Sequence, residues 1–191
     1  GGSGTVGSSF IKEFYDNYIF YNVSRNESQI TKLKQNFPKV KSFLADIRDL
    51  DSMINIFEKV KPDIVIHAAA LKHVNLAEEN PSKAVEINIV GSLNIIKASI
   101  RAEVPLTIGI STDKACAPIN VYGMCKAISE RLYVDFANSQ NDIKVCLCRY
   151  GNVLESTGSV IPFFKDLLNS GSTELPITHK DMTRFLLTLD H

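Results

Sequence analysis

Two side chains in this sequence, Tyr122 and Lys126, have the types and the spacing needed for acid–base chemistry. Residues four apart share a face of a helix, so a helix here would place the phenol beside the ammonium. A nearby positive charge favours phenolate, which makes the phenol proton easier to remove. Just upstream, Thr112, Asp113 and Lys114 place a hydroxyl, a carboxyl and an amine in consecutive positions. With a glycine-rich start of the chain, these groups indicate redox chemistry at a nicotinamide cofactor.

Each part of this group has an ordinary alternative explanation. The Tyr-x-x-x-Lys spacing often arises by chance, and Asp113–Lys114 can be a solvated turn pair. The joint occurrence favours chemistry, because the polar group directly follows the apolar run Leu106–Ser111. Ligands of open α/β sheets bind beyond the carboxyl ends of the strands, which is where these side chains would lie.

The elements that must position these groups alternate between strand and helix patterns, which predicts a parallel α/β sheet with helices on both faces. The near-continuous apolar runs Asp63–Ala68 and Leu106–Ser111 predict strands that are covered on both faces. The other expected strands are Tyr18–Val23, Ser42–Ala45 and Lys144–Cys148. The expected helices are Asp51–Val60, Pro81–Arg101, one capped by Asn120 that runs to Phe136, and Pro162–Leu168.

The expected helix after Asn120 carries an apolar stripe with the spacing of a core-facing side. Tyr122 and Lys126 fall at the edge of this stripe, which would suit side chains that line a cleft. The stripe consists of Val121, Cys125, Ile128, Leu132 and Phe136.

The first seven residues contain glycines at Gly1, Gly4 and Gly7, with Thr5 and Val6 between them. Before a helix, such a loop lets the backbone approach a pyrophosphate, which then faces the helix N-terminus. The alternative is a glycine-serine linker. The loop has no strand before it, so we expect the sequence to be part of a longer protein. We assign residues 1–150 to a nucleotide-binding domain and residues 151–191 to the start of a substrate-binding region.

Cofactor preference depends on the residues after the strand Tyr18–Val23. Arg25 follows Ser24 about 20 residues beyond the glycine loop, where arginine accommodates the phosphate of NADP. We therefore favour NADP over NAD, although Arg25 can also be a solvated residue, with Glu27 nearby. Asp46, followed by Ile47, can accept a hydrogen bond from adenine or cap the turn after its strand.

The stretch from His67 to His73 follows the expected strand Asp63–Ala68. The small residues Ala68, Ala69 and Ala70 leave room for a cofactor, or for tight packing of a helix. His67 is best explained as a core histidine. Lys72 lies in the loop beyond the strand, at the edge of the sheet where ligands bind.

The amino-acid composition limits the kinds of binding partner and the cellular compartment that we expect. The 191 residues include 21 basic and 21 acidic side chains, so a basic surface for nucleic acid or an anionic membrane is not expected. No apolar run is long enough to span a bilayer, and we expect a cytoplasmic protein. The four cysteines match no common zinc pattern, so no metal is expected and the thiols are interpreted as buried and reduced. Cys146 and Cys148 should face the same side of a strand.

The sequence resembles the extended short-chain dehydrogenase/reductase family, and within it the nucleotide-sugar 4,6-dehydratases of the polysaccharide-biosynthesis group. The resemblance is greatest to UDP-N-acetylglucosamine 4,6-dehydratases that invert the 5-position. It extends from Gly1 to about Phe185, and its blocks are GGSGTVG, HAAALKHV, STDKA, PINVYGMCK, RYGNV and MTRF. It implies a Rossmann fold, a UDP-sugar substrate, self-association and no membrane or nucleic-acid partner.

The resemblance also implies roles for individual residues. Tyr122 would take the proton of the sugar 4-hydroxyl while hydride leaves the 4-position, and Lys126 would hold the nicotinamide ribose. Thr112 would bind the same hydroxyl, Lys114 would remove the 5-proton and Asp113 would protonate the departing 6-hydroxyl. The implied substrate contacts are Lys72, His73, Asn152 and Arg184. The implied cofactor contacts are Gly1, Gly4, Thr5, Val6, Gly7, Ser24, Arg25, Asp46, Ile47, Ala68, Ala69, Ala70, Tyr122 and Lys126.

Two rival functions use the same residues. A nucleotide-sugar 4-epimerase would need Tyr122 and Lys126 but no acid and base at the 5- and 6-positions, so Asp113 and Lys114 argue against it. A cofactor-binding module without turnover is the second rival, and the complete set of five polar residues argues against it. Asn152 and Arg184 also have ordinary explanations, as a turn residue and as part of a surface ion pair.

Overall fold

The computed structural model describes residues 1–139, 143–156 and 158–188. The chain divides into two compact units, Gly1–Arg149 and Tyr150–His191. Among the described residues, no helix combines the length and the apolar character needed to cross a membrane.

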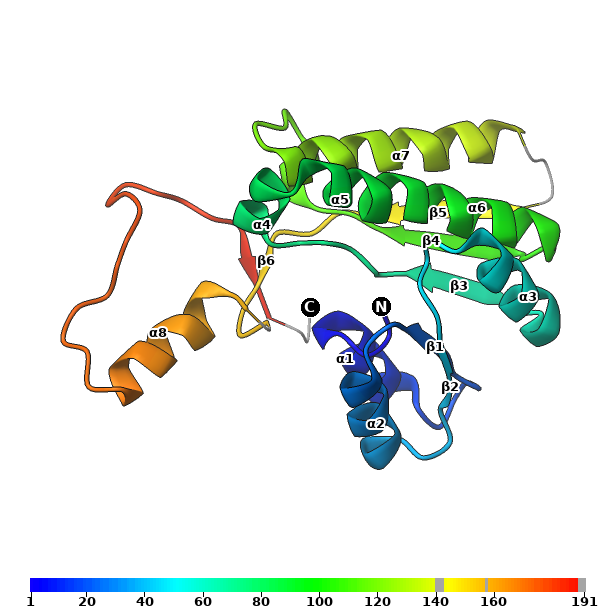
Figure 1. Cartoon of the computed structure of the whole chain (residues 1–191), viewed down its shortest axis with the longest axis horizontal. Coiled ribbons are helices and arrows are strands. Elements are labelled where there is room, and N and C mark those ends of the chain that lie inside the picture. Colours follow the sequence, from blue (N-terminus) through cyan, green and yellow to red (C-terminus); the bar gives the residue numbers. More distant parts are fainter. Residues whose placement is uncertain (140–142, 157, 189–191) are drawn as a thin grey trace. The chain divides into compact units, whose positions relative to one another are not determined.

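Within each sheet of the first unit, neighbouring strands run parallel (Figure 1). One pair joins β1 to β2, and a three-stranded sheet has the order β3-β4-β5. Its register places His67 opposite Gly109 and Gly109 opposite Leu147, so the carboxyl ends of these strands lie at one edge. The five expected strands are confirmed, four of them with shifted ends. Their bounds are β1 Tyr21–Ser24, β2 Lys41–Leu44, β3 Ile64–His67, β4 Leu106–Ile110 and β5 Lys144–Cys148.

The expected helices of the first unit are also confirmed. The predicted helix Pro81–Arg101 is one continuous run that passes through a π-helical segment, Glu86–Val90. Caps hold several helices in place: the Asn26 and Asp49 side chains accept hydrogen bonds from backbone N–H groups of the helices that follow them. The bounds are α1 Thr5–Phe14, α2 Glu27–Asn36, α3 Leu50–Val60, α4 Val74–Glu79, α5 Pro81–Val85, η1 Glu86–Val90, α6 Gly91–Arg101, η2 Asp113–Ala115 and α7 Val121–Ser139.

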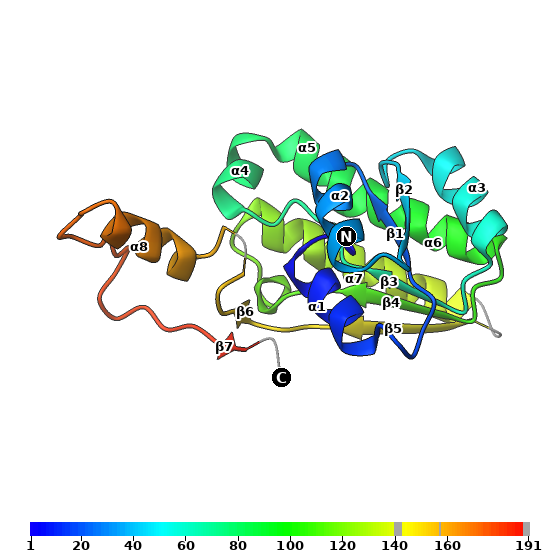
Figure 2. The same cartoon turned by 90° about the horizontal axis from the view of Figure 1, so that it is seen from below.

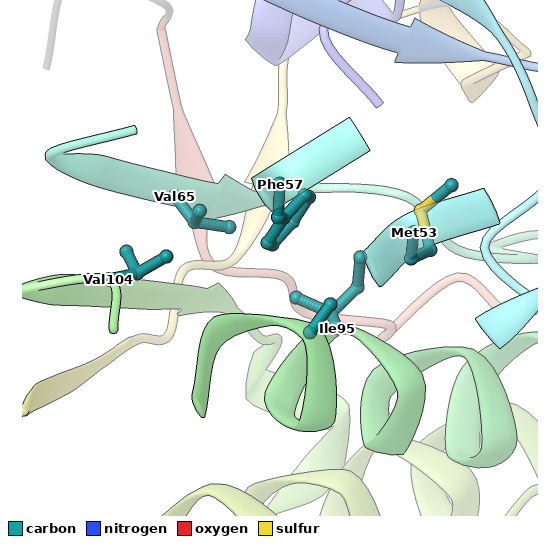
Figure 3. Packing of buried hydrophobic residues seen from close by; sticks show 6 residues of the cluster. Met53, Phe57, Val65, Ile95 and Val104 are labelled. Carbon is teal, nitrogen blue, oxygen red and sulfur yellow. The ribbon is translucent and has the colours of Figure 1, made fainter. Parts of the chain in front are cut away.

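The largest buried cluster lies between α3, β3 and α6. Met53 and Phe57 on α3 pack against Val65 of β3 and Ile95 of α6, with Val104 beside them (Figure 3). This packing explains why α3 and α6 are amphipathic, since each turns one apolar side to the cluster. The cluster therefore ties the helices to the sheet whose carboxyl edge carries the polar group.

The helices α6 and α7 lie side by side on one face of the three-stranded sheet (Figure 1). Ile96 of α6 packs with Tyr133 and Phe136 of α7, and side chains of β5 complete this second cluster. The expectation that Asp63–Ala68 is covered on both faces is wrong for β3. Val65 and His67 are buried, whereas Ile64 and Ile66 are 43% and 38% exposed, because the helices cover only one side of this strand.

The cysteines are free thiols, but the expectation that they are buried holds only for Cys125. Cys116, Cys146 and Cys148 are exposed. Alternation along β5 is the reason: Val145 and Leu147 turn toward α6 and α7, so Cys146 and Cys148 share the opposite, uncovered face.

The second unit contains two short parallel strands joined through a helix. Its elements are β6 Asn152–Val153, α8 Val160–Asn169 and β7 Leu186–Leu187, with Asn152 paired to Leu186. The predicted helix Pro162–Leu168 lies within α8 and is confirmed. Any side chain at Gly151 would collide with Phe185, since a Cβ atom there would lie 2.4 Å from its carbonyl oxygen.

Candidate active site

The turn after β4 carries the three consecutive polar residues. The Thr112 hydroxyl donates a hydrogen bond of 2.9 Å to Oδ1 of Asp113 and accepts one of 3.3 Å from the backbone N–H of Lys114. The Lys114 ammonium donates to the same Asp113 oxygen over 3.0 Å. The three side chains thus form one hydrogen-bonded group at the carboxyl end of the strand.

The helix α7 packs directly against this turn. Asn120 caps the helix as predicted, because its side chain accepts a hydrogen bond of 2.8 Å from the N–H of Gly123. A Cβ atom at Gly123 would lie 2.3 Å from the carbonyl oxygen of Lys114, so only glycine allows this approach. The residues of the turn and the first turn of α7 are therefore held together.

Lys126 lies deep in the structure at 5% exposure. Its ammonium donates a hydrogen bond of 2.6 Å to the carbonyl oxygen of Ile110, the last residue of β4. Burial lowers the pKa of Lys126 to about 8, and the nearby negative charge of Glu130 opposes this shift. A lysine with this pKa is still mostly cationic at neutral pH, so it can stabilise a nearby phenolate.

Tyr122 lies one helical turn before Lys126 and is 9% exposed. It packs with Ala77 and Ala84, and with Leu71 and Val74 of the loop and helix that follow β3. The Tyr122 side chain thus lies where α7 packs against the loop that contains Lys72 and His73.

The predicted orientation of α7 is wrong in part. Ile128, expected in the core, is 48% exposed, whereas Tyr122 and Lys126 are buried and not at the edge of a stripe. The reason is that α7 buries a largely polar face. Ser129 donates a hydrogen bond of 2.8 Å to Ser92 of α6, and Lys126 bonds to β4. Apolar periodicity cannot detect a face that is held by hydrogen bonds.

The glycine loop packs against the ends of two strands. A Cβ atom at Gly1 would lie 2.4 Å from the carbonyl carbon of Ala68, and the Gly1 nitrogen donates to Val23 over 3.1 Å. A Cβ atom at Gly7 would lie 2.5 Å from the Cα of Gly2. Figure 2 shows the N-terminus close to α1 and β1. This packing is that of a folded loop and not of a linker.

The loop leads into α1 as expected. Gly4 is extended and precedes the helix, so Thr5 and Val6 lie in its first turn. Gly1 and the Ala68–Ala69 backbone come together at the carboxyl edge of the sheet, whereas Ala70 lies further along the same loop. The start of a helix and a closely approaching glycine backbone are the features that hold a pyrophosphate.

Ser24 and Arg25 lie at the end of β1, next to the glycine loop. The Ser3 hydroxyl donates a hydrogen bond of 3.0 Å to that of Ser24. Arg25 lies 3.9 Å from the carboxylate of Asp46, which also pairs with Arg48 at 2.7 Å. The hydrogen bond from Arg48 is the main cause that lowers the pKa of Asp46. Asp46 also caps its own turn, since it accepts from the backbone N–H of Arg48.

The loop after β3 is held by a side chain that the sequence did not single out. The amide of Asn88 accepts a hydrogen bond of 2.8 Å from the N–H of Leu71 and donates one of 3.0 Å to its carbonyl. Asn88 lies in the π-helical segment, so the widened turn supports the loop that precedes Lys72 and His73. Burial lowers the pKa of Lys72. Asn94 holds Ile47 in the same way, through a hydrogen bond of 3.0 Å to its carbonyl.

His67 is a core histidine, as the sequence indicates. Its Nδ1 lies 2.7 Å from the hydroxyl of Tyr133, and the ring is buried. Burial is the main cause that lowers the pKa of His67 to about 3, and the charge of Lys126 adds to it. His67 is therefore neutral at ordinary pH.

The remaining two residues belong to the second unit. Asn152 begins β6, and its backbone N–H donates a hydrogen bond of 2.7 Å to Phe185. Arg184 precedes Phe185 and is exposed, and its guanidinium donates to the carbonyl of Thr183 over 2.8 Å. The two residues thus lie on neighbouring segments of the same unit.

A buried acidic residue, Glu130, was not anticipated as part of the site. It accepts hydrogen bonds from the Ser111 hydroxyl and from Nε of Arg149, the latter over 2.8 Å. Its position four residues after Lys126 was a signal in the sequence, since the two must share a face of the helix.

Comparisons with known proteins agree with this architecture. The family model described as "Polysaccharide biosynthesis protein" matches residues 1–191. A UDP-N-acetylglucosamine 4,6-dehydratase (inverting) of Campylobacter jejuni is 41% identical over 100% of this chain and 58% of its own length. A UDP-glucose 4-epimerase of Rickettsia canadensis is 37% identical over 99% of this chain and 58% of its own length. The chain thus spans less than two thirds of the curated relatives it matches.

Solved structures show the same fold. The structure of Pen from Bacillus thuringiensis has a TM-score of 0.92 and 33% identity, over 100% of this chain and 62% of that one. DesIV of Streptomyces venezuelae, a dTDP-glucose 4,6-dehydratase with NAD bound, has a TM-score of 0.87 at 21% identity, over 100% of this chain and 67% of that one. The second similarity concerns the fold alone. The chain belongs to the polysaccharide biosynthesis protein family, within the extended short-chain dehydrogenases/reductases.

Proposed function

We propose that this protein is a nucleotide-sugar 4,6-dehydratase that converts UDP-N-acetylglucosamine to a 4-keto-6-deoxy sugar with inversion at the 5-position. The observation that carries the proposal is the hydrogen-bonded group Thr112–Asp113–Lys114, which α7 holds beside Tyr122 and Lys126. The similarity to the Campylobacter jejuni dehydratase supports the choice of substrate.

The glycine loop suits a dinucleotide, because Gly1 can pack against the Ala68 backbone and Gly7 against Gly2, which gives the tight turn before α1 that such a loop needs. We propose NADP, with Ser24 and Arg25 at its ribose phosphate and Ala68–Ala70 along its length. When bound, this cofactor would accept a hydride from the sugar 4-position and later return it to the 6-position. The packing of the glycine loop supports a nicotinamide dinucleotide, and Arg25 supports the phosphorylated form.

In the first half of the reaction, Tyr122 takes the proton of the sugar 4-hydroxyl. The charge of Lys126 stabilises the phenolate that Tyr122 needs for this step. Thr112 holds the same hydroxyl. The resulting 4-ketone acidifies the neighbouring 5-proton, and this allows an amine base to remove it.

The second half needs a neutral amine at Lys114 and a protonated carboxyl at Asp113. Burial alone would raise the pKa of Asp113, but hydrogen bonds from Lys114 and Thr112 outweigh it and lower the pKa. In the ion pair both groups are thus charged. Their 3.0 Å hydrogen bond offers a simple solution, because transfer of one proton yields base and acid together.

With that proton transferred, Lys114 removes the 5-proton and Asp113 protonates the departing 6-hydroxyl. One molecule of water leaves, and the sugar gains a double bond between its 5- and 6-positions until hydride returns to the 6-position. Protonation of the 5-position from the opposite face gives inversion. Lys72 is the residue we propose for this proton, since burial lowers its pKa and eases proton release. Asn152 and Arg184 are proposed to hold the nucleotide diphosphate.

The test is incubation of the full-length protein with UDP-N-acetylglucosamine in deuterated water, followed by NMR and mass spectrometry. We expect loss of one water, a 4-keto-6-deoxy product and deuterium at an inverted 5-position. A 4-epimer without loss of water would replace the proposal with the epimerase function known for the Rickettsia relative. Unchanged sugar, with folded and cofactor-loaded protein, would refute this substrate and favour a binding module.

A further inference from the structure

Glu130 is a charged side chain inside the first unit that the proposed reaction does not use. It is 7% exposed, and its carboxylate accepts hydrogen bonds from the hydroxyl of Ser111 and from the guanidinium of Arg149. The hydrogen bond from Arg149 is the main cause that lowers the pKa of Glu130, so the carboxylate is negative at neutral pH. A buried charge is costly unless it is paired and hydrogen-bonded, as the Glu130 carboxylate is.

The partners of Glu130 are adjacent to those of Lys126. Lys126 bonds to the carbonyl of Ile110, and Glu130, one helical turn later, bonds to the side chain of Ser111. One turn before Lys126, Gly123 meets the carbonyl of Lys114. Three positions on one face of α7 therefore contact the chain from the end of β4 to the end of the polar turn. This arrangement fixes the helix and the turn in one register.

We propose that Glu130 is a positioning residue: it anchors the Thr112–Lys114 turn to α7 through Ser111, and it supplies the buried negative charge that keeps Lys126 cationic. Arg149, from the end of β5, holds the carboxylate in place for both tasks. Glu130 itself touches neither sugar nor cofactor. This inference rests on the proposed function for its purpose, but its physical content can be measured without any turnover.

Loss of the Glu130 charge should lower the pKa of Lys126 in two ways. Burial lowers the pKa of Lys126 and Glu130 raises it. On β3, His67 is neutral, because its pKa of about 3 lies far below the working range. Loss of the Glu130 charge would leave Arg149 as an unpaired cation in the same network. Both effects would make Lys126 lose its proton at lower pH.

The first measurement is a pH titration of Lys126 in protein with [ε-¹³C]lysine, where the signal is assigned from its loss in Lys126→Met. In Glu130→Gln we expect the midpoint to fall by roughly one pH unit. Glu130→Asp keeps the charge, so the titration midpoint of Lys126 should stay near that of the natural protein. Asp135→Asn removes one carboxylate from the exposed side of the same helix and should leave it unchanged. An unchanged midpoint in Glu130→Gln would refute the electrostatic task.

The second measurement is amide hydrogen exchange in the peptide that spans Ile110–Ala115, followed by mass spectrometry. Glu130→Gln and Ser111→Ala should each exchange roughly tenfold faster there, because a hydrogen bond to a buried charge is weakened or lost. Asp135→Asn should exchange at the rate of the natural protein. Equal rates in all four proteins would refute the anchoring task. Neither readout depends on the sugar, so failure here and failure of the dehydratase assignment are distinguishable.

Discussion

Gly123 on α7 lies so close to Lys114 that a Cβ atom at Gly123 would be only 2.3 Å from the carbonyl oxygen of Lys114. The contact joins the helix that carries Tyr122 and Lys126 to the turn that carries Asp113 and Lys114. Backbone atoms cannot move aside as the end of a flexible side chain can. Any larger residue must therefore separate the helix from the turn.

The first prediction concerns this contact. Gly123→Ala should lower kcat for the proposed reaction at least 100-fold, because a shift of about 1 Å between reacting groups has that cost. Alanine has a higher helix propensity than glycine, which offsets part of the clash. The free energy of unfolding should therefore change less than the activation free energy of the reaction. Steady-state kinetics and thermal unfolding of the same samples check this. Met124→Ala, one residue along and 48% exposed, is the control and should retain activity. Full activity in Gly123→Ala would show that the close approach is not needed.

The second prediction concerns the buried ammonium of Lys126, whose pKa falls from its ordinary value of 10.5 to about 8 on burial. Between these two pH values the unfolded chain binds more protons than the folded one, so the free energy of unfolding should rise with pH there. Below pH 8 both states are protonated and the full cost of burying the charge remains. One such group contributes at most about 1.4 kcal/mol per pH unit.

Denaturant unfolding of the natural protein and of Lys126→Met at several pH values between 7 and 10.5 measures this contribution. The difference between the two proteins should grow with pH in favour of the natural one. Lys97→Met removes an exposed lysine from α6 and should show no such trend. A difference that stays constant with pH would mean that Lys126 is not desolvated.

The third prediction separates the roles of Asp113 and Lys114. Lys114→Met should abolish incorporation of deuterium at the 5-position, because the base for that proton is gone. Asp113→Asn should retain some exchange at the 5-position but lose elimination of water by a factor of roughly 10² to 10⁴, the usual contribution of a general acid. NMR of the sugar recovered from deuterated water distinguishes the two outcomes. If Lys114→Met still exchanges the 5-proton, the base is a different residue.

Much of the fold could be predicted because its signals are local. Asn120 marks the start of α7 by its capping side chain, and Pro81 marks the start of the long helix that continues to Arg101. The polar turn was predictable as well, since Thr112, Asp113 and Lys114 are neighbours in the chain and directly follow an apolar strand.

The inner face of α7 could not be predicted in the same way. Its buried contacts are hydrogen bonds between Ser129 and Ser92 and between Lys126 and Ile110, which apolar periodicity does not record. The pairing of Glu130 with Arg149 depends on β5 lying beside β4, a tertiary fact that no local pattern contains. The same holds for Asn88, whose amide reaches a loop formed earlier in the chain.

The fourth prediction concerns cofactor choice. Arg25 has a side chain that is 57% exposed and lies 3.9 Å from Asp46, whose carboxylate is already paired more closely with Arg48. The ion pair of Arg25 with Asp46 is thus long and exposed, and the guanidinium can bind a phosphate beside Ser24 instead. Arg25→Ala should weaken NADP binding by roughly ten- to a hundredfold, the range expected for one charge-assisted hydrogen bond or two.

Binding of NAD should change little in Arg25→Ala, because NAD has no phosphate at that position. Titration calorimetry with each cofactor on the full-length protein measures both affinities. Arg101→Ala removes an exposed arginine at the end of α6, paired with Glu58, and serves as the control for a general loss of positive charge. Equal weakening of NADP and NAD would place Arg25 at a part that both cofactors share. No weakening of either would make Arg25 the ordinary solvated residue that the sequence also allows.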